Sequence, residues 1–124
     1  MNKSLMPLIG LSAAVSLLAG CGGVSELTKE RVARSETVVT AATQTVGSSE
    51  TGALELQRAK DNLAQAQAAL KDGDEKSAER YAQHAQLGAE LAIAKSQSGA
   101  ARKAADEVLA SIETLRREAA RSPQ

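Results

Sequence analysis

The single cysteine, Cys21, is the residue of this chain best placed for covalent chemistry. It follows Leu18-Ala19-Gly20, and this Leu-small-small-Cys run ends an apolar N-terminal segment. The pattern is typical of a bacterial lipobox, in which the bond before the cysteine is cut and its nucleophilic sulfur takes a diacylglyceryl group. The new N-terminal amine usually takes a further acyl chain such as palmitate. The sequence therefore predicts an N-acyl, S-diacylglycerol cysteine at position 21.

The residues before Cys21 have the parts of an export signal. Lys3 supplies the positive charge, and residues 5–18 form an apolar run rich in Leu, Ala, Ile and Val. A permanent membrane-spanning helix needs about 20 apolar residues, so this run is too short. We expect residues 1–20 to be a signal peptide that is removed and residues 21–24 to be a lipidated tether. The alternative is an ordinary secretory signal whose cleavage site lies close to a cysteine.

The predicted anchor also indicates a location. One acyl chain holds a protein only marginally, at about 0.8 kcal/mol per buried CH₂, whereas two or three chains make a lasting anchor. In Gram-negative bacteria an Asp after the lipidated cysteine often marks retention in the inner membrane. Gly22 stands there instead. We therefore expect a cell-envelope protein anchored by lipid in the outer membrane and facing the periplasm.

The other chemically capable residues form no recognisable catalytic pattern. His84 is the only histidine, and a catalytic role would need an acid or a nucleophile positioned beside it. The sequence places none there, so we expect His84 to be a partly exposed residue of a helix. No glycine-rich phosphate loop, nucleophile elbow or Cys/His metal spacing occurs. We expect no enzyme activity, no catalytic residue, no metal and no cofactor.

An acidic run around Gly73 resembles a metal loop only superficially. In the EF-hand pattern Lys76 and Ser77 would occupy a ligand position and the glycine position, and Gln83 would replace the terminal glutamate. Asp74 and Glu75 are better interpreted as residues that cap a helix and favour its positive end.

The composition limits the kinds of element that could position these residues. The chain has no Trp, no Phe and one Tyr, and much of its apolar content is Ala. Such side chains bury little area each, so an elongated all-α structure with narrow seams is favoured over a deep core. The formal net charge is zero and both signs are interspersed. This argues against nucleic-acid binding and against a polybasic membrane patch.

The first expected helix covers residues 25–46. Ser25 can cap its N-terminus. Apolar or small residues recur in it at alternating spacings of three and four, which is helical: Val32, Ser35, Val39, Ala42 and Val46. Several threonines are poor helix formers, so the helix needs its neighbours. A strand is the alternative, but the pattern does not alternate by two.

The second expected helix covers residues 53–71, after a loop at residues 47–52. Leu56, Leu63 and Leu70 are seven residues apart, and alanines lie between them. This spacing is typical of a coiled-coil seam. Gly73 supplies the residue that ends the helix.

The third expected helix is long and covers residues 75–120. One stripe on it is made only of alanine: Ala78, Ala82, Ala85, Ala89 and Ala92. A second stripe alternates spacings of three and four without a break: His84, Leu87, Leu91, Ala94, Ser98, Ala101, Ala105, Val108, Ile112, Leu115 and Ala119. At 1.5 Å per residue the helix would be roughly 65–70 Å long.

The short loops favour antiparallel neighbours, giving an elongated helical hairpin or three-helix bundle. The second helix matches only the first half of the third, so roughly residues 97–120 should overhang the bundle. An exposed apolar stripe of this kind usually has a partner. The predicted partner interface consists of Ala101, Ala105, Val108, Ile112 and Leu115.

Residues 56–94 read LxxAxxxLxxAxxAL, then GD, then AxxYAxxAxxxAxLAIA. This pattern resembles the family called domain of unknown function 4398, which implies a small, helical, periplasmic lipoprotein of bacteria without an assigned activity. The family often has an aromatic residue after Gly-Asp, where this chain has Glu75. The resemblance therefore implies a fold and a location but no mechanism.

The expected function is that of a structural or interaction module anchored to the membrane by lipid. It would associate with itself or with another envelope protein. One alternative is a tetratricopeptide-like hairpin that binds a protein or peptide. Another is non-covalent contact with peptidoglycan through a basic distal end formed by Lys103, Arg116, Arg117 and Arg121, although Glu113 can pair with Arg117 on the helix.

Overall fold

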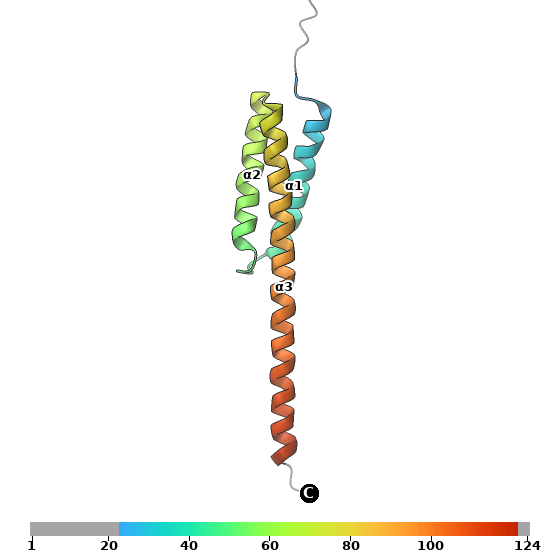
Figure 1. The fold of residues 1–124 in the computed structure, drawn as a ribbon, viewed down its shortest axis with the longest axis vertical. Helices are drawn as coiled ribbons and strands as arrows, with labels where there is room; N and C mark the ends of the chain where they lie inside the picture. The colour runs from blue at the N-terminus through green and yellow to red at the C-terminus, as the bar shows by residue number, and fades with distance from the viewer. Residues whose placement is uncertain (1–22, 122–124) are drawn as a thin grey trace, which may run out of the picture.

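The computed structural model describes residues 23–121, which form three α-helices and no strand. The helices are α1 (Glu26–Val46), α2 (Ala53–Asp72) and α3 (Glu75–Arg121). α1 and α2 lie against one half of α3, and the other half of α3 extends beyond them (Figure 1). The predicted all-α bundle with a long, overhanging C-terminal helix is confirmed. The predicted signal peptide and Cys21 lie outside the described residues.

The helix limits differ from the expected ones by one residue at three ends. Ser25 caps α1, as predicted, so the helix itself begins one residue later at Glu26. The Ser25 side chain accepts a hydrogen bond from the Thr28 N–H at 3.3 Å. α2 continues to Asp72, and α3 continues to Arg121. Such one-residue differences are usual at helix ends, where the hydrogen-bond pattern changes gradually.

α1 buries the stripe expected from its spacing, and the buried stripe begins one turn earlier at Thr28. Thr28 and Ser35 are both fully buried, although each has a hydroxyl group. The Ser35 hydroxyl donates to the Val32 carbonyl oxygen at 2.7 Å within the same helix. A buried hydroxyl needs such a partner, because an unpaired polar group in a protein interior is costly.

The α2–α3 turn depends on Gly73. Its φ of 76° lies in the left-handed region, where a residue without a side chain is favoured. The Gly73 N–H donates to the Leu70 oxygen at 3.3 Å, and the Asp74 N–H donates to the Ala69 oxygen at 2.9 Å. This is the Schellman pattern that satisfies the last carbonyls of a helix. Asp74 then caps α3 by accepting the Ser77 N–H at 3.1 Å.

The bundle core is built mainly from small residues. On α3, the buried side chains are those of the alanine stripe and Ser96. The alanines of the stripe pack in two clusters, one with Val39, Ala42, Val46 and Leu56, the other with Val32, Ala66 and Ala69. Alanine in the seam lets the helix axes approach closely, so contact between backbones replaces contact between large side chains.

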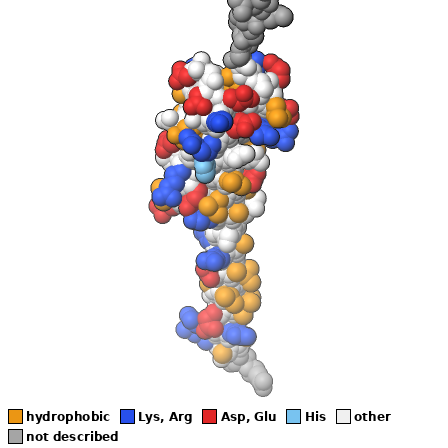
Figure 2. Space-filling view, turned by 45° about the horizontal axis from the view of Figure 1, so that its top comes forward, with side chains coloured by type: hydrophobic (Ala, Val, Ile, Leu, Met, Phe, Trp, Pro, Cys, Tyr) orange, Lys and Arg blue, Asp and Glu red, His pale blue; other side chains and the backbone are white. Residues whose placement is uncertain are grey.

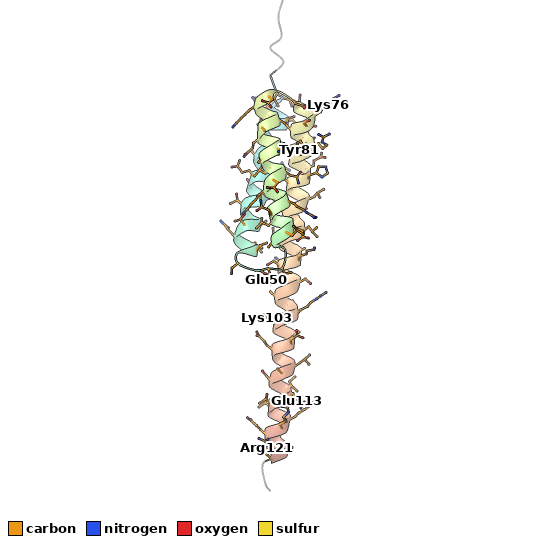
Figure 3. The ribbon with its side chains drawn as sticks, turned by 90° about the vertical axis from the view of Figure 1, so that its left-hand side faces the viewer. Glu50, Lys76, Tyr81, Lys103, Glu113 and Arg121 are labelled. Carbon is orange, nitrogen blue, oxygen red and sulfur yellow. The ribbon has the colours of Figure 1, made fainter. Side chains whose placement is uncertain are left out.

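The part of α3 beyond the bundle is a single exposed helix. Ser96 is the last buried residue of α3, Gly99 is half-buried, and every residue from Ala100 to Arg121 is exposed. We call residues 100–121 the extension; it is roughly 30 Å long. It starts three residues later than expected, because Thr51 in the α1–α2 loop lies against Gly99. Figure 3 shows Lys103, Glu113 and Arg121 along it, beyond the loop that contains Glu50.

The alanine stripe is interrupted by charges in the extension. Of the positions that continue its spacing there, Lys103, Asp106, Glu113 and Arg117 are charged, and Ala110 and Ala120 are alanines. A helix placed on this side of the extension would have to bury these four charged side chains, which is costly. The sequence of α3 therefore favours packing against α1 and α2 through its first half.

Candidate protein-interaction surface

The extension carries a group of exposed aliphatic side chains. Val108, Ile112 and Leu115 are 59%, 41% and 63% exposed, and Ala101 and Ala105 are also exposed. These five residues are the interface predicted from the sequence, and the structure leaves all of them uncovered within the described chain. Figure 2 shows hydrophobic side chains gathered along one side of the extension, with charged side chains near its tip.

Leu109 belongs to the same surface but does not fit the predicted stripe. It is 63% exposed and follows Val108 directly. The sequence signal was present, since a leucine beside a three–four stripe widens it to the broader apolar face of a packed helix. We call the six residues the distal surface: Ala101, Ala105, Val108, Leu109, Ile112 and Leu115.

The second stripe of α3 is also exposed in the first half of the helix, where α1 and α2 pack against the alanine stripe. Leu87 and Leu91 are 62% and 49% exposed, whereas Ala85, Ala89 and Ala92 beside them are fully buried. The leucines therefore lie on the side of α3 that faces away from α1 and α2. The apolar surface of α3 thus starts on the bundle and continues along the extension.

Charged side chains at the tip pair within the helix. Arg117 Nε lies 3.0 Å from Glu113 Oε1, as their four-residue separation predicted. Both side chains are exposed, at 69% and 51%, so this pair stabilises the helix only slightly. The pairing supports the interpretation of these charges as helix-surface residues.

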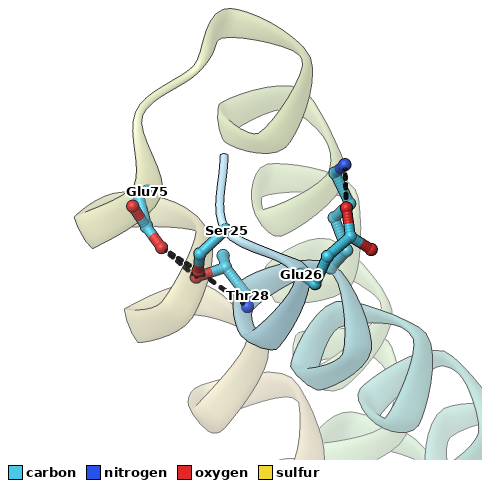
Figure 4. A network of polar contacts seen from close by, with 5 residues as sticks. Ser25, Glu26, Thr28 and Glu75 are labelled. Carbon is cyan, nitrogen blue, oxygen red and sulfur yellow. Dashed lines mark hydrogen bonds and ion pairs between the residues drawn. The ribbon is translucent and has the colours of Figure 1, made fainter. Parts of the chain in front are cut away.

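A polar cluster lies at the opposite end of the bundle (Figure 4). The Thr28 hydroxyl lies 2.7 Å from a carboxylate oxygen of Glu75 and 3.1 Å from one of Glu79, and Ser25 also donates to Glu75. Arg31 pairs with Glu79 at 3.1 Å. These bonds join the start of α1 to the start of α3.

The hydrogen bonds of this end change the acidity of two carboxyl groups. Hydrogen bonds from Ser25 and then Thr28 lower the pKa of Glu75. A hydrogen bond from Ser77 lowers the pKa of Asp74. In both cases the bonds favour the charged form. The structure thus gives Asp74 a capping role and Glu75 a role in joining two helices.

The single histidine, His84, and the single tyrosine, Tyr81, both lie on the first half of α3. His84 is exposed. Tyr81 is half-buried and packs, with Leu70, against the cluster that contains Val32, while the Arg80 guanidinium lies 5.0 Å from its ring centre. Within residues 23–121 no group of three or more His, Cys, Asp or Glu side chains could hold a metal ion. In the same range no helix combines the length and apolar character needed to cross a bilayer.

Comparison with known proteins gives one family. The family model described as "Domain of unknown function (DUF4398)" matches residues 30–108, which include most of α1, all of α2 and α3 as far as the middle of the distal surface. No curated protein matches the chain, and no solved structure does. The family match covers more than half of the sequence. The chain therefore belongs to the DUF4398 family.

Proposed function

We propose that this protein is a lipid-anchored module of the bacterial cell envelope that holds a protein-binding helix away from the membrane. The anchor would be the acylated Cys21, and the binding element would be the extension of α3. The proposed location is the outer membrane, with the helices in the periplasm.

The arrangement of the two ends supports this proposal. The described chain begins at Gly23, beside the α2–α3 turn, and the extension leaves the bundle at its other end (Figure 1). An acylated Cys21 would lie only two residues before Gly23. The polar cluster of Thr28, Glu75 and Glu79 would then lie near the lipid surface, and the distal surface would point away from it.

The observation that carries the proposal is the exposure of the distal surface. An isolated helix of this length gains little stability from its own hydrogen bonds, and helices in proteins are stabilised mainly by packing an apolar face. Fully burying one Val, Leu or Ile side chain contributes about 1.5–3 kcal/mol. A partner that covers Val108, Leu109, Ile112 and Leu115 would therefore stabilise both the complex and the helix.

The proposed role is binding and not catalysis. The distal surface is the outside of a single helix, so it is convex, whereas small-molecule and catalytic sites are generally concave. Amphipathic helices with anchors at such spacings commonly bind other helices or grooves.

The anchor is tested by feeding a bacterial host that exports the full-length chain a clickable palmitate analogue. We expect the wild-type chain and the Ser48→Ala control to be labelled, and the Cys21→Ala variant to be unlabelled. Mass spectrometry of the purified product should show residues 1–20 removed and a diacylglyceryl group on Cys21. A free thiol at Cys21, or residues 1–20 still attached, would overturn the anchor.

The binding role is tested separately with a photo-crosslinking amino acid in the same cells. We expect light-dependent adducts when it replaces Leu115 and few when it replaces Arg117, which points away from the apolar side. Equal yields at the two positions would overturn the assignment of the distal surface as a binding site.

A further inference from the structure

We propose that the partner of the distal surface is a second copy of this chain, with the two α3 helices packed parallel and in register as a two-stranded coiled coil. This inference rests on the proposed function, since it names the partner of the extension. Four observations on α3 support it.

The first observation is the heptad register of the exposed stripe. Leu91, Ser98, Ala105 and Ile112 take the a positions, and Leu87, Ala94, Ala101, Val108 and Leu115 take the d positions. The register is unbroken over four heptads. Its most apolar heptad has Ile112 at a and Leu115 at d, the combination that favours parallel two-stranded coiled coils.

The second observation is that α1 and α2 leave this seam free. In the same register the buried residues Ala85 and Ala92 take b positions, and Ala89 and Ser96 take f positions. Positions b and f lie on the side of a helix away from the a/d seam. α2 comes near the seam only on its e side, where Ala59 lies against Gly88 and Glu55 pairs with Lys95. The a and d residues themselves stay uncovered, so two copies can join their α3 helices along the exposed stripe with the α1–α2 hairpins beside it.

The third observation is charge complementarity, which selects the direction. In a parallel pair, a g residue faces the e residue five positions later on the other helix. Glu90 takes a g position and Lys95 the following e position. A parallel pair would therefore have two attractive contacts, each between Glu90 of one copy and Lys95 of the other. In an antiparallel pair, the e positions of one helix would instead face the e positions of the other. Three e residues are basic, namely Lys95, Arg102 and Arg116, so like charges would meet.

Lys95 can form this contact while keeping its present partner. It is bound to Glu55 of α2, and its side chain remains 49% exposed. An ammonium group has three donors, so Glu90 of the second copy can add to Glu55. Glu90 is exposed and accepts a hydrogen bond from Gln86 at 2.9 Å, which leaves acceptor sites on its carboxylate.

The fourth observation explains Leu109, the exposed leucine outside the stripe. It takes an e position, and the g residue five positions before it is Ala104. In the parallel pair Leu109 would contact Ala104 of the second copy and widen the seam. The same pairing therefore uses every residue of the distal surface.

The experiment is disulfide cross-linking of the full-length chain in host membranes. Leu115→Cys places a thiol at d, where two helices in a parallel pair lie close enough for a disulfide, whose Cα atoms are about 4.4–6.8 Å apart. Thr114→Cys is the matched control, since Thr114 is also exposed and takes the outward c position. After mild oxidation we expect at least a tenfold higher yield of dimer for Leu115→Cys.

The outcomes separate the possible partners. Equal dimer yields for the two variants, or no dimer for Leu115→Cys, would overturn the parallel pair. Trimers in a glutaraldehyde cross-linking control would overturn the two-stranded state. The wild-type chain is the control for dimers that form through Cys21. Labelling of Cys21 by the palmitate analogue is measured in the same membranes. An unlabelled chain that still forms the Leu115→Cys dimer would overturn the anchor and leave the pair standing.

A second variant tests the pair without introducing a thiol. Ile112→Glu combined with Leu115→Glu should shift the purified chain from dimer to monomer in sedimentation, whereas Thr114→Glu should not. Ile112 and Leu115 are exposed and belong to neither core cluster, so the double variant should keep the folded α1–α2–α3 bundle, as measured by its unfolding transition. An unchanged dimer in the double variant would overturn the proposal.

Discussion

Gly52 lies directly against the backbone of Ala92, so that a Cβ atom on residue 52 would be 2.5 Å from the Ala92 carbonyl oxygen. The φ of Gly52 is 90°, a value that side-chain-bearing residues rarely adopt. Two separate requirements, the backbone angle and the close approach, therefore select glycine where the α1–α2 loop enters α2. This contact positions the loop against α3 just before the extension begins.

The substitution Gly52→Ala should destabilise the bundle strongly. The left-handed angle alone costs about 1–2 kcal/mol for a residue with a side chain, and the contact with the Ala92 backbone adds to it. We expect a loss of about 2–4 kcal/mol in the free energy of unfolding, measured by urea titration. Gly73→Ala is the control, because Gly73 has φ 76° but open space around it. Equal losses for the two variants would show that the close approach has no energetic weight.

The alanine stripe of α3 should not tolerate larger side chains. Ala89 is fully buried among Val39, Ala42 and Leu56 of the neighbouring helices. Ala89→Leu should therefore lower the free energy of unfolding by about 1–3 kcal/mol through overpacking. Ala110→Leu, an outward position on the extension, should change it by less than about 0.5 kcal/mol. Thermal melts of both variants by circular dichroism give the comparison, and a tolerated Ala89→Leu would contradict the close-packed seam.

Thr28→Val should make the stability of the bundle less sensitive to acid. Folding lowers the pKa of Glu75 through hydrogen bonds from Ser25 and Thr28. A carboxyl whose pKa is lowered by folding contributes stability above its unfolded pKa, and this contribution is lost as the pH falls through its folded pKa. The wild-type chain should therefore lose stability below the ordinary glutamate pKa of about 4.3, and Thr28→Val should lose less.

The measurement for Thr28→Val is the free energy of unfolding at pH 7 and at pH 3. At pH 7 the variant should be less stable than wild type, because the hydrogen bond from the Thr28 hydroxyl to the Glu75 carboxylate is lost. Thr40→Val is the control, since the exposed Thr40 hydroxyl bonds only within its own helix, to the Glu36 oxygen. Glu55 and Asp74 also have lowered pKa values, so only the difference between variants assigns the effect to the cluster. If the stability of Thr28→Val and of wild type fell equally between pH 7 and pH 3, the assignment of the acid sensitivity to the Thr28–Glu75 hydrogen bond would be wrong.

Glu90→Lys should weaken the proposed parallel pair. It would set two lysines, residue 90 of one copy and Lys95 of the other, against each other on both sides of the seam. Exposed charge pairs are worth about 0.2–1 kcal/mol each, so the loss of two of them should raise the dimer dissociation constant by roughly two- to thirtyfold at low salt. Glu107→Lys, at an outward c position, should change it less. An effect of equal size for both variants, or one insensitive to salt, would argue against the g–e contact.

Much of the fold could be predicted because its signals are local. Ser25, Gly73 and Asp74 act within one helical turn of their own position, so the residue type alone indicated where helices begin and end. The seam of α1 could also be predicted, since Val32, Val39 and Val46 repeat at a fixed spacing. The distal surface was predicted by the same spacing except for Leu109, which a single stripe does not include.

The sequence by itself determined three helices, their limits to within a residue, and an apolar stripe running along α3. Only the tertiary structure decided which stripe faces α1 and α2, because both stripes of α3 repeat with the same period. The alanines are buried because backbones can meet there, as at Gly52 and Ala92, while Leu87 and Leu91 stay outside. The contact of Thr28 with Glu75 joins residues 47 positions apart, which no local pattern encodes.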